Sequence, residues 1–146
     1  MRSLMMAVVL GVLPAAGGAC TYLAPFAMES LPLAELVVVG KVTGYQPLDA
    51  PWGAALVTVA VEQALKGDVE AEVTFIWNSG MAQGPHESRT KGLVMIGAMK
   101  GGRVAVSAMM PDARPDLPSV VQPYCGDVWI QPATAARVAE AKEALK

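Results

Sequence analysis

The sequence has little histidine and little cysteine. His86, Cys20 and Cys125 are the only such residues among 146. A protein zinc site takes three or four histidine, cysteine or carboxylate ligands, so this scarcity argues against a resident metal. An HExxH motif would need a second histidine four residues after His86, where the chain has Thr90. We therefore expect no metal, no cofactor and no catalytic residue.

Charge is also sparse. Eleven Lys and Arg residues face 13 Asp and Glu residues, for a net charge of -2, and charged residues make up 16% of the chain. Proteins that bind nucleic acid usually carry a strongly basic patch or stripe. We therefore expect no nucleic-acid partner.

The first residues follow the pattern of a signal peptide. Arg2 precedes the apolar stretch Leu4–Leu13, and small residues then lead to Cys20. A bilayer span needs about 20 apolar residues, so this stretch is too short for an anchor. The pattern predicts a signal peptide over residues 1–19 and one mature domain over residues 20–146. The mature protein would be secreted or periplasmic, with no transmembrane span.

A bacterial lipoprotein is the alternative interpretation. In that case Cys20 would be acylated before cleavage and would tether the protein to the envelope, with a structural or interaction role. Such sites usually have leucine three places before the cysteine, and Gly17 stands there. Both alternatives leave the oligomeric state open.

The two cysteines lie far apart along the mature chain. Because disulfides persist outside the cytosol, we expect Cys20 and Cys125 to pair. Closing so long a loop stabilises a fold by up to about 4–5 kcal/mol in the chain-entropy model. The bond would also hold the N-terminus against the rest of the domain.

Hydrophobic alternation with a period of two predicts strands along the mature chain. The expected strands are Leu36–Tyr45, Leu56–Leu65, Val69–Trp77, Gly92–Met99 and Arg103–Met110, with a shorter one at Val128–Ile130. The connections between them are expected to be irregular, including a long exposed loop over residues 78–91 whose role is open. A short helical turn is expected within Phe26–Leu33, and a C-terminal helix over Thr134–Lys146, with Thr134 as N-cap.

Five principal strands, one terminal helix and no βαβ alternation indicate an all-β fold with helical additions. We predict a five-stranded antiparallel OB-like barrel plus the C-terminal helix, with a two-sheet sandwich as the alternative. Gly40 and Gly44 fall on the same face of the first strand. Glycine inside a strand often marks a bulge or the sharp coiling that closes a small barrel.

Three stretches of the mature chain resemble the tissue-inhibitor-of-metalloproteinase-like, or netrin-like, domains in their short bacterial form. They are Cys20-Thr21, Ala34–Val42 (AELVVVGKV), and Val59–Gly67 (VAVEQALKG) running into Glu72–Phe75 (EVTF). The resemblance covers about the first half of the mature chain. It implies the same barrel that the strand pattern predicts.

The resemblance also implies a mode of action. In inhibitory members, the free α-amine and carbonyl of the N-terminal cysteine chelate the zinc of a metalloproteinase, and the next side chain enters its specificity pocket. These roles would fall to Cys20 and Thr21. Inhibitory members have a second cysteine two residues after the first, where this chain has Tyr22. A metalloproteinase is therefore the candidate partner, with Cys20, Thr21 and Tyr22 as contact residues.

Other polar and aromatic side chains have ordinary structural explanations. His86 is expected to be a solvated loop residue, and three glutamates to lie on the solvent faces of strands: Glu62, Glu70 and Glu72. Trp77 and Trp129 are expected in the core or at its rim, while Trp52, in a Pro-Gly loop, is the candidate contact residue. The expected function is therefore non-catalytic binding of a protein in the envelope or outside the cell.

Overall fold

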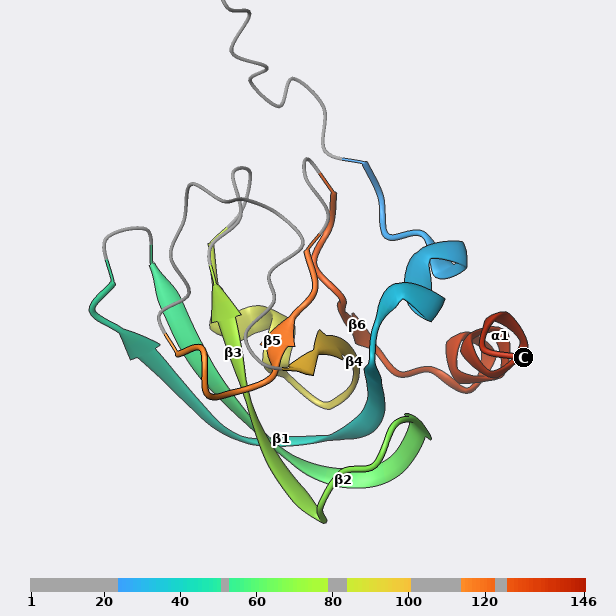
Figure 1. The fold of residues 1–146 in the computed structure, drawn as a ribbon, viewed down its shortest axis with the longest axis horizontal. Helices are drawn as coiled ribbons and strands as arrows, with labels where there is room; N and C mark the ends of the chain where they lie inside the picture. The colour runs from blue at the N-terminus through green and yellow to red at the C-terminus, as the bar shows by residue number, and fades with distance from the viewer. Residues whose placement is uncertain (1–23, 51–52, 79–83, 101–113, 123–125) are drawn as a thin grey trace, which may run out of the picture.

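The computed structural model describes residues 24–50, 53–78, 84–100, 114–122 and 126–146. They form a closed barrel of five strands, with one α-helix and a short 3-10 helix packed on one side (Figure 1). In chain order the elements are η1 (Met28–Leu33), β1 (Leu36–Leu48), β2 (Ala54–Lys66), β3 (Glu72–Asn78), η2 (Glu87–Thr90), β4 (Leu93–Met99), β5 (Ser119–Val120), β6 (Ile130–Pro132) and α1 (Ala135–Ala144). The expected all-β barrel with helical additions is confirmed.

The strands close in the order β1-β2-β3-β5-β4, and β4 pairs back onto β1. Every neighbouring pair in this ring is antiparallel except β3 and β5, which are parallel at Ile76 and Ser119. The expectation of a wholly antiparallel barrel was therefore wrong for one pair. A closed ring with an odd number of strands cannot alternate direction all the way round, so at least one pair must be parallel. The arrangement is compatible with an OB-like barrel.

β1 bends so that it can pair on both of its edges. It pairs with β2 along its length and with β4 from Leu36 to Lys41. Its register to β2 shifts at three points, including the steps into Gly40 and into Gly44. A Cβ added at Gly40 would lie 2.4 Å from the carbonyl oxygen of Ala60. The bulges expected at these glycines are confirmed, and Gly40 allows the backbones to approach closely.

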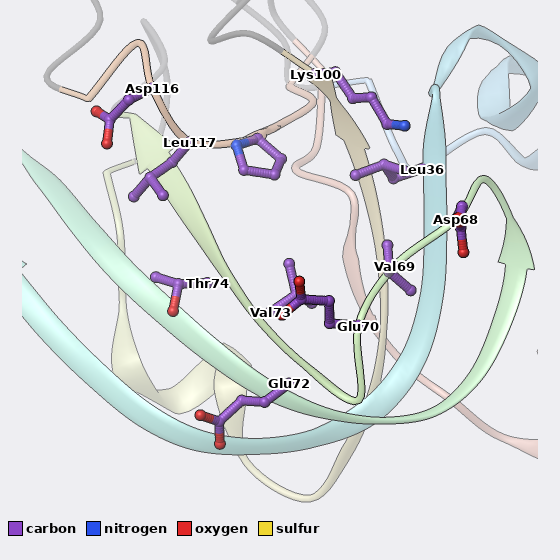
Figure 2. Close-up of a pocket in the computed structure, with 11 residues that line it drawn as sticks. Leu36, Asp68, Val69, Glu70, Glu72, Val73, Thr74, Lys100, Asp116 and Leu117 are labelled. Carbon is purple, nitrogen blue, oxygen red and sulfur yellow. The ribbon is translucent and has the colours of Figure 1, made fainter.

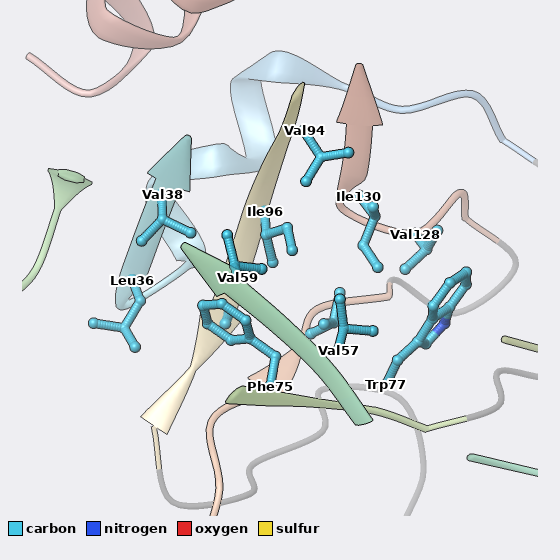
Figure 3. Packing of buried hydrophobic residues seen from close by; sticks show 12 residues of the cluster. Leu36, Val38, Val57, Val59, Phe75, Trp77, Val94, Ile96, Val128 and Ile130 are labelled. Carbon is cyan, nitrogen blue, oxygen red and sulfur yellow. The ribbon is translucent and has the colours of Figure 1, made fainter. Parts of the chain in front are cut away.

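The barrel interior holds one cluster of buried apolar side chains (Figure 3). Its members are Leu36, Val38, Val57, Val59, Phe75, Trp77, Val94, Ile96, Ala98, Val120, Val128 and Ile130. A second cluster lies outside the barrel, beneath η1 and α1: Leu31, Ala34, Val37, Val39, Met95, Val121, Trp129 and Ala141. The first half of β1 supplies both clusters, which explains its unbroken apolar run.

Several element boundaries differ from the expected ones. β1 continues through Pro47 to Leu48, because its last residues pair with the start of β2. β3 begins at Glu72 rather than Val69, after a turn in which Gly67 has a positive φ of 78°. The short strand β5 lies in a stretch expected to be irregular, and β6 is shifted toward Pro132. The expected strand Arg103–Met110 lies outside the described residues.

The C-terminal helix begins as expected. The Thr134 side chain caps it by accepting a hydrogen bond from the Arg137 backbone N–H at 3.3 Å. Ala141 is fully buried, and Val138 and Leu145 pack against the outer cluster. Ala135 is exposed, because it lies at the first turn of the helix, beyond the outer cluster.

Candidate functional site

The chain just after Cys20–Tyr22 is fastened to the barrel. Ala24 forms a parallel bridge with Gly126, and the Asp127 backbone N–H donates to the Ala24 carbonyl oxygen at 3.0 Å. Two residues later, the ring of Phe26 meets that of Trp129 edge to face, with centroids 6.0 Å apart. A backbone bridge and an aromatic contact therefore attach residues 24–26 to the rest of the domain.

A polar cluster centred on Asp127 lies beneath this segment. One carboxylate oxygen accepts from the Arg89 guanidinium at 2.7 Å and from the Val128 N–H at 2.9 Å. The other accepts from Gln131 Nε2 at 3.1 Å. Arg137 of α1 donates to Gln131 Oε1 at 3.2 Å. The cluster thus joins η2, β6 and α1 at the point where the N-terminal segment is attached.

Gln131 links Asp127 to Arg137 within this cluster. It is buried, and its amide nitrogen donates to both Asp127 and the Val128 carbonyl oxygen while its amide oxygen accepts from Arg137. A buried amide with both ends satisfied holds its neighbours in fixed positions. No local motif in the sequence points to this cluster, because Arg89 and Arg137 are far apart along the chain. Only the fold brings them together.

An open cavity of about 400 Å³ adjoins the cluster. Its lining comes from the N-terminal segment, from the cluster and from α1: Pro25, Phe26, Ala27, Met28, Glu29, Asp127, Gln131, Arg137 and Glu140. Carboxylates and a guanidinium line the same hollow. The arrangement offers hydrogen-bonding groups to a polar or charged segment lying across it.

The residues expected to contact a partner lie outside the described part of the chain. These are Cys20, Thr21, Tyr22 and Trp52, and Cys125 lies outside it as well. The structure describes residues close to them in the sequence. Ala24 and Gly126, which form the bridge, lie near Cys20–Tyr22 and Cys125 respectively. The paired residues Leu48 and Ala54 lie before and after Trp52.

The other side chains singled out in the sequence have the expected environments. His86 is exposed and caps η2, with its Nδ1 2.7 Å from Ser88 Oγ. The three glutamates Glu62, Glu70 and Glu72 are exposed. Trp77 and Trp129 are buried in the inner and outer clusters respectively. η2 was not expected, since residues 78–91 show no period.

Three ionisable side chains among the described residues have shifted pKa values: Tyr45, Asp116 and Arg114, whose pKa is raised by its hydrogen bond to Asp116. Hydrogen bonds from the Arg114 guanidinium lower the pKa of Asp116 below that of an ordinary aspartate. Burial, and secondarily the charge of Glu87, raise the pKa of Tyr45. Within the described ranges, no three His, Cys, Asp or Glu side chains are grouped as metal ligands.

No helix in the described part of the chain combines the length and the apolar character needed to cross a membrane. No protein-family model matches the sequence, and a search of curated proteins returns no match.

Proposed function

We propose that the chain is an exported, non-catalytic β-barrel domain that binds a protein partner through its N-terminal segment, Cys20–Tyr22, with Trp52 as a further contact residue. The observation that carries this proposal is the attachment at Ala24 and Phe26. A binding segment whose point of attachment is already ordered loses less conformational entropy on binding.

The expected disulfide is consistent with this attachment. Gly126 directly follows Cys125, and Ala24 lies four residues after Cys20. The bridge between Ala24 and Gly126 therefore joins two described residues that lie close in the sequence to the two cysteines, which supports their pairing. A Cys20–Cys125 bond would then add a covalent link next to the backbone bridge.

The resemblance to netrin-like domains suggests a zinc metalloproteinase as the partner. A mature N-terminus at Cys20 would present a neutral α-amine and a carbonyl oxygen that together form a five-membered chelate. That chelate would displace the water from the open coordination position of a catalytic zinc. Thr21 would then enter the specificity pocket of the protease.

The first experiment is an intact mass of protein purified from the native host, with and without reduction and alkylation. We expect a mass that begins at Cys20 and gains two alkyl groups only after reduction. A mass raised by acyl chains, with Cys125 alkylated without reduction, would show that Cys20 is acylated and not paired with Cys125. An acylated α-amine cannot chelate zinc, so this result would refute the proposed mode of binding. It would establish the lipid-anchored alternative instead.

The second experiment tests inhibition directly. Mature protein beginning at Cys20 is titrated against a panel of zinc metalloproteinases, alongside a variant that carries one extra alanine before Cys20. The extension removes the chelating amine but keeps the disulfide and the barrel. We expect inhibition by the first protein and not by the second. Equal inhibition by both, or inhibition by neither, would contradict the chelation mechanism.

A further inference from the structure

A groove opens on the barrel between β3 and the end of β4 (Figure 2). Its volume is about 440 Å³. Asp68, Glu70 and Val73 come from β3 and the turn before it, Lys100 follows β4, and Leu117 precedes β5. None of the residues that line it also lines the cavity beside the N-terminal segment. The groove is therefore a second surface, separate from the one proposed above.

One side of the groove is an open strand edge. The Ile76 N–H donates to the Pro118 carbonyl oxygen at 2.9 Å, so the backbone groups of Ile76 point away from β2. Backbone direction alternates along a strand, so those of Thr74 and Glu72 point the same way. Thr74 and Thr58 also bring their hydroxyls within 3.0 Å, as expected for a pair that shares no backbone hydrogen bond.

The chain before β5 turns away from this edge. Pro118 has no N–H, and the Leu117 N–H donates to the Arg114 carbonyl oxygen at 3.1 Å. In the described part of the chain, β3 is paired on this edge at Ile76 and at no residue from Glu72 to Phe75. Exposed strand edges of this kind accept an added strand.

The groove has an apolar floor and an acidic rim. Val69 and Val73 are half-buried and pack against the interior cluster, and Leu117 flanks them. The carboxylates of Asp68 and Glu70 stand at the rim and are exposed (Figure 2).

Two further carboxylates and one ammonium group complete the rim. Glu72 lies 3.4 Å from Thr43 Oγ1, and Asp116 is paired with Arg114 at 2.6 Å. Lys100 adds one positive charge to the lining. Even with Arg114 counted beside Asp116, the four carboxylates outnumber the two cations, so the groove favours a positively charged occupant.

We propose that the edge of β3 from Glu72 to Phe75 is a docking site for an extended basic segment of a partner protein, which adds a strand to the barrel. The backbone groups of Glu72 and Thr74 would bind the main chain of that segment. In a strand, successive side chains point to opposite faces. An apolar side chain would therefore rest on Val69 and Val73 while its basic neighbours reach the carboxylates of Asp68 and Glu70.

The test uses a fluorescently labelled, end-capped peptide of the sequence Lys-Val-Lys-Val-Lys and measures its fluorescence anisotropy with the full mature protein. We expect saturable binding that weakens as the ionic strength rises toward about 0.15 M, because the rim carboxylates are exposed. The matched peptide Glu-Val-Glu-Val-Glu should not bind. Failure of the lysine peptide to bind, including failure because the protein's own chain fills the groove, overturns the proposal.

Two controls separate strand addition from general attraction of charge. The same lysine peptide with N-methyl groups on all of its backbone amides keeps its charge but loses every backbone donor, whichever of its residues face β3, and it should bind about tenfold more weakly. In a ¹⁵N-labelled sample, the amides of Glu72 and Thr74 should shift and gain protection from exchange when the unmodified peptide is added. Equal binding of both peptides, without change at these amides, refutes strand addition.

A pair of double variants locates the site. Asp68→Lys with Glu70→Lys should weaken binding by at least about tenfold. Glu62→Lys with Glu143→Lys changes the net charge by the same amount at exposed positions that line neither the groove nor the cavity beside the N-terminal segment, and binding should be nearly unchanged. If both double variants lose binding equally, the attraction belongs to the overall charge and the proposed site is wrong.

Discussion

Phe26 meets Trp129 edge to face, with ring centroids 6.0 Å apart and ring planes inclined by 77°. The Trp129 indole also lies against Gly97 of β4, where an added Cβ would come within 2.5 Å of its Cε3 atom. The indole thus contacts both a strand that closes the barrel and the segment that leads to the N-terminus. This contact connects the rigid core to the proposed binding segment.

Phe26→Ala should release the N-terminal segment. An aromatic pair contributes about 0.5–1.5 kcal/mol beyond the area it buries, so we expect the free energy of unfolding to fall by about 1–3 kcal/mol. Chemical denaturation measures this loss, and limited proteolysis should cut earlier near Ala24. Leu33→Ala is the matched control, because Leu33 is 71% exposed and should lose less than about 0.5 kcal/mol. Equal losses in the free energy of unfolding for the two variants would show that Phe26 does not anchor the N-terminal segment.

Gly40→Ala should strain the closure of the barrel. The added methyl would lie 2.4 Å from the Ala60 carbonyl oxygen and 2.6 Å from Val59 Cγ1, and the backbone atom cannot move without breaking the pairing. We expect a loss of stability of about 2–4 kcal/mol in urea unfolding followed by tryptophan fluorescence. Gly44→Ala, whose nearest atom would be Thr58 Cβ at 3.3 Å, should lose clearly less. The reverse order would be inconsistent with a close approach at Gly40.

Asp127→Ala should weaken the polar cluster beneath the N-terminal segment. The Val128 N–H and Gln131 Nε2 would lose an acceptor in a partly buried site, so we expect a loss of about 1.5–3 kcal/mol. Asp116→Ala also removes a carboxylate paired with an arginine, but that pair is largely exposed. Its removal should leave the free energy of unfolding nearly unchanged. Similar effects of the two substitutions would argue against a structural role for the cluster.

The Asp116 carboxyl should titrate at a lower pH than an ordinary aspartate, because the Arg114 guanidinium donates two hydrogen bonds that lower its pKa. A carboxyl with a lowered folded-state pKa contributes its stabilisation above the unfolded-state pKa. That contribution is lost as the pH falls through the lowered value. NMR titration of the side-chain carboxyl carbon measures this pKa directly.

Arg114→Ala is the control for this titration and should return the Asp116 pKa toward its ordinary value. An unchanged pKa in the variant would show that Arg114 is not the cause of the shift.

Local signals in the sequence determined most of the elements. An apolar run predicted β1 and β4, alternating valines predicted β2, Thr134 predicted the start of α1, and the glycines of β1 predicted its bulges. These predictions succeed because each depends only on neighbouring residues. The side-chain period of a strand, the capping of a helix and the lack of a Cβ at glycine all act over a few residues. The burial of Trp77 and Trp129 follows from the same local pattern.

The tertiary structure alone decided what depends on distant partners. The two-residue strand β5 exists because it fills the gap between β3 and β4, and its parallel pairing follows from closing an odd-numbered ring. No spacing in the sequence predicts the polar cluster formed by Arg89, Asp127, Gln131 and Arg137. Among the described residues, β3 has no strand partner on one edge from Glu72 to Phe75, and this too is invisible in the sequence, because whether a strand lies at an edge depends on which segments meet it after the chain has folded.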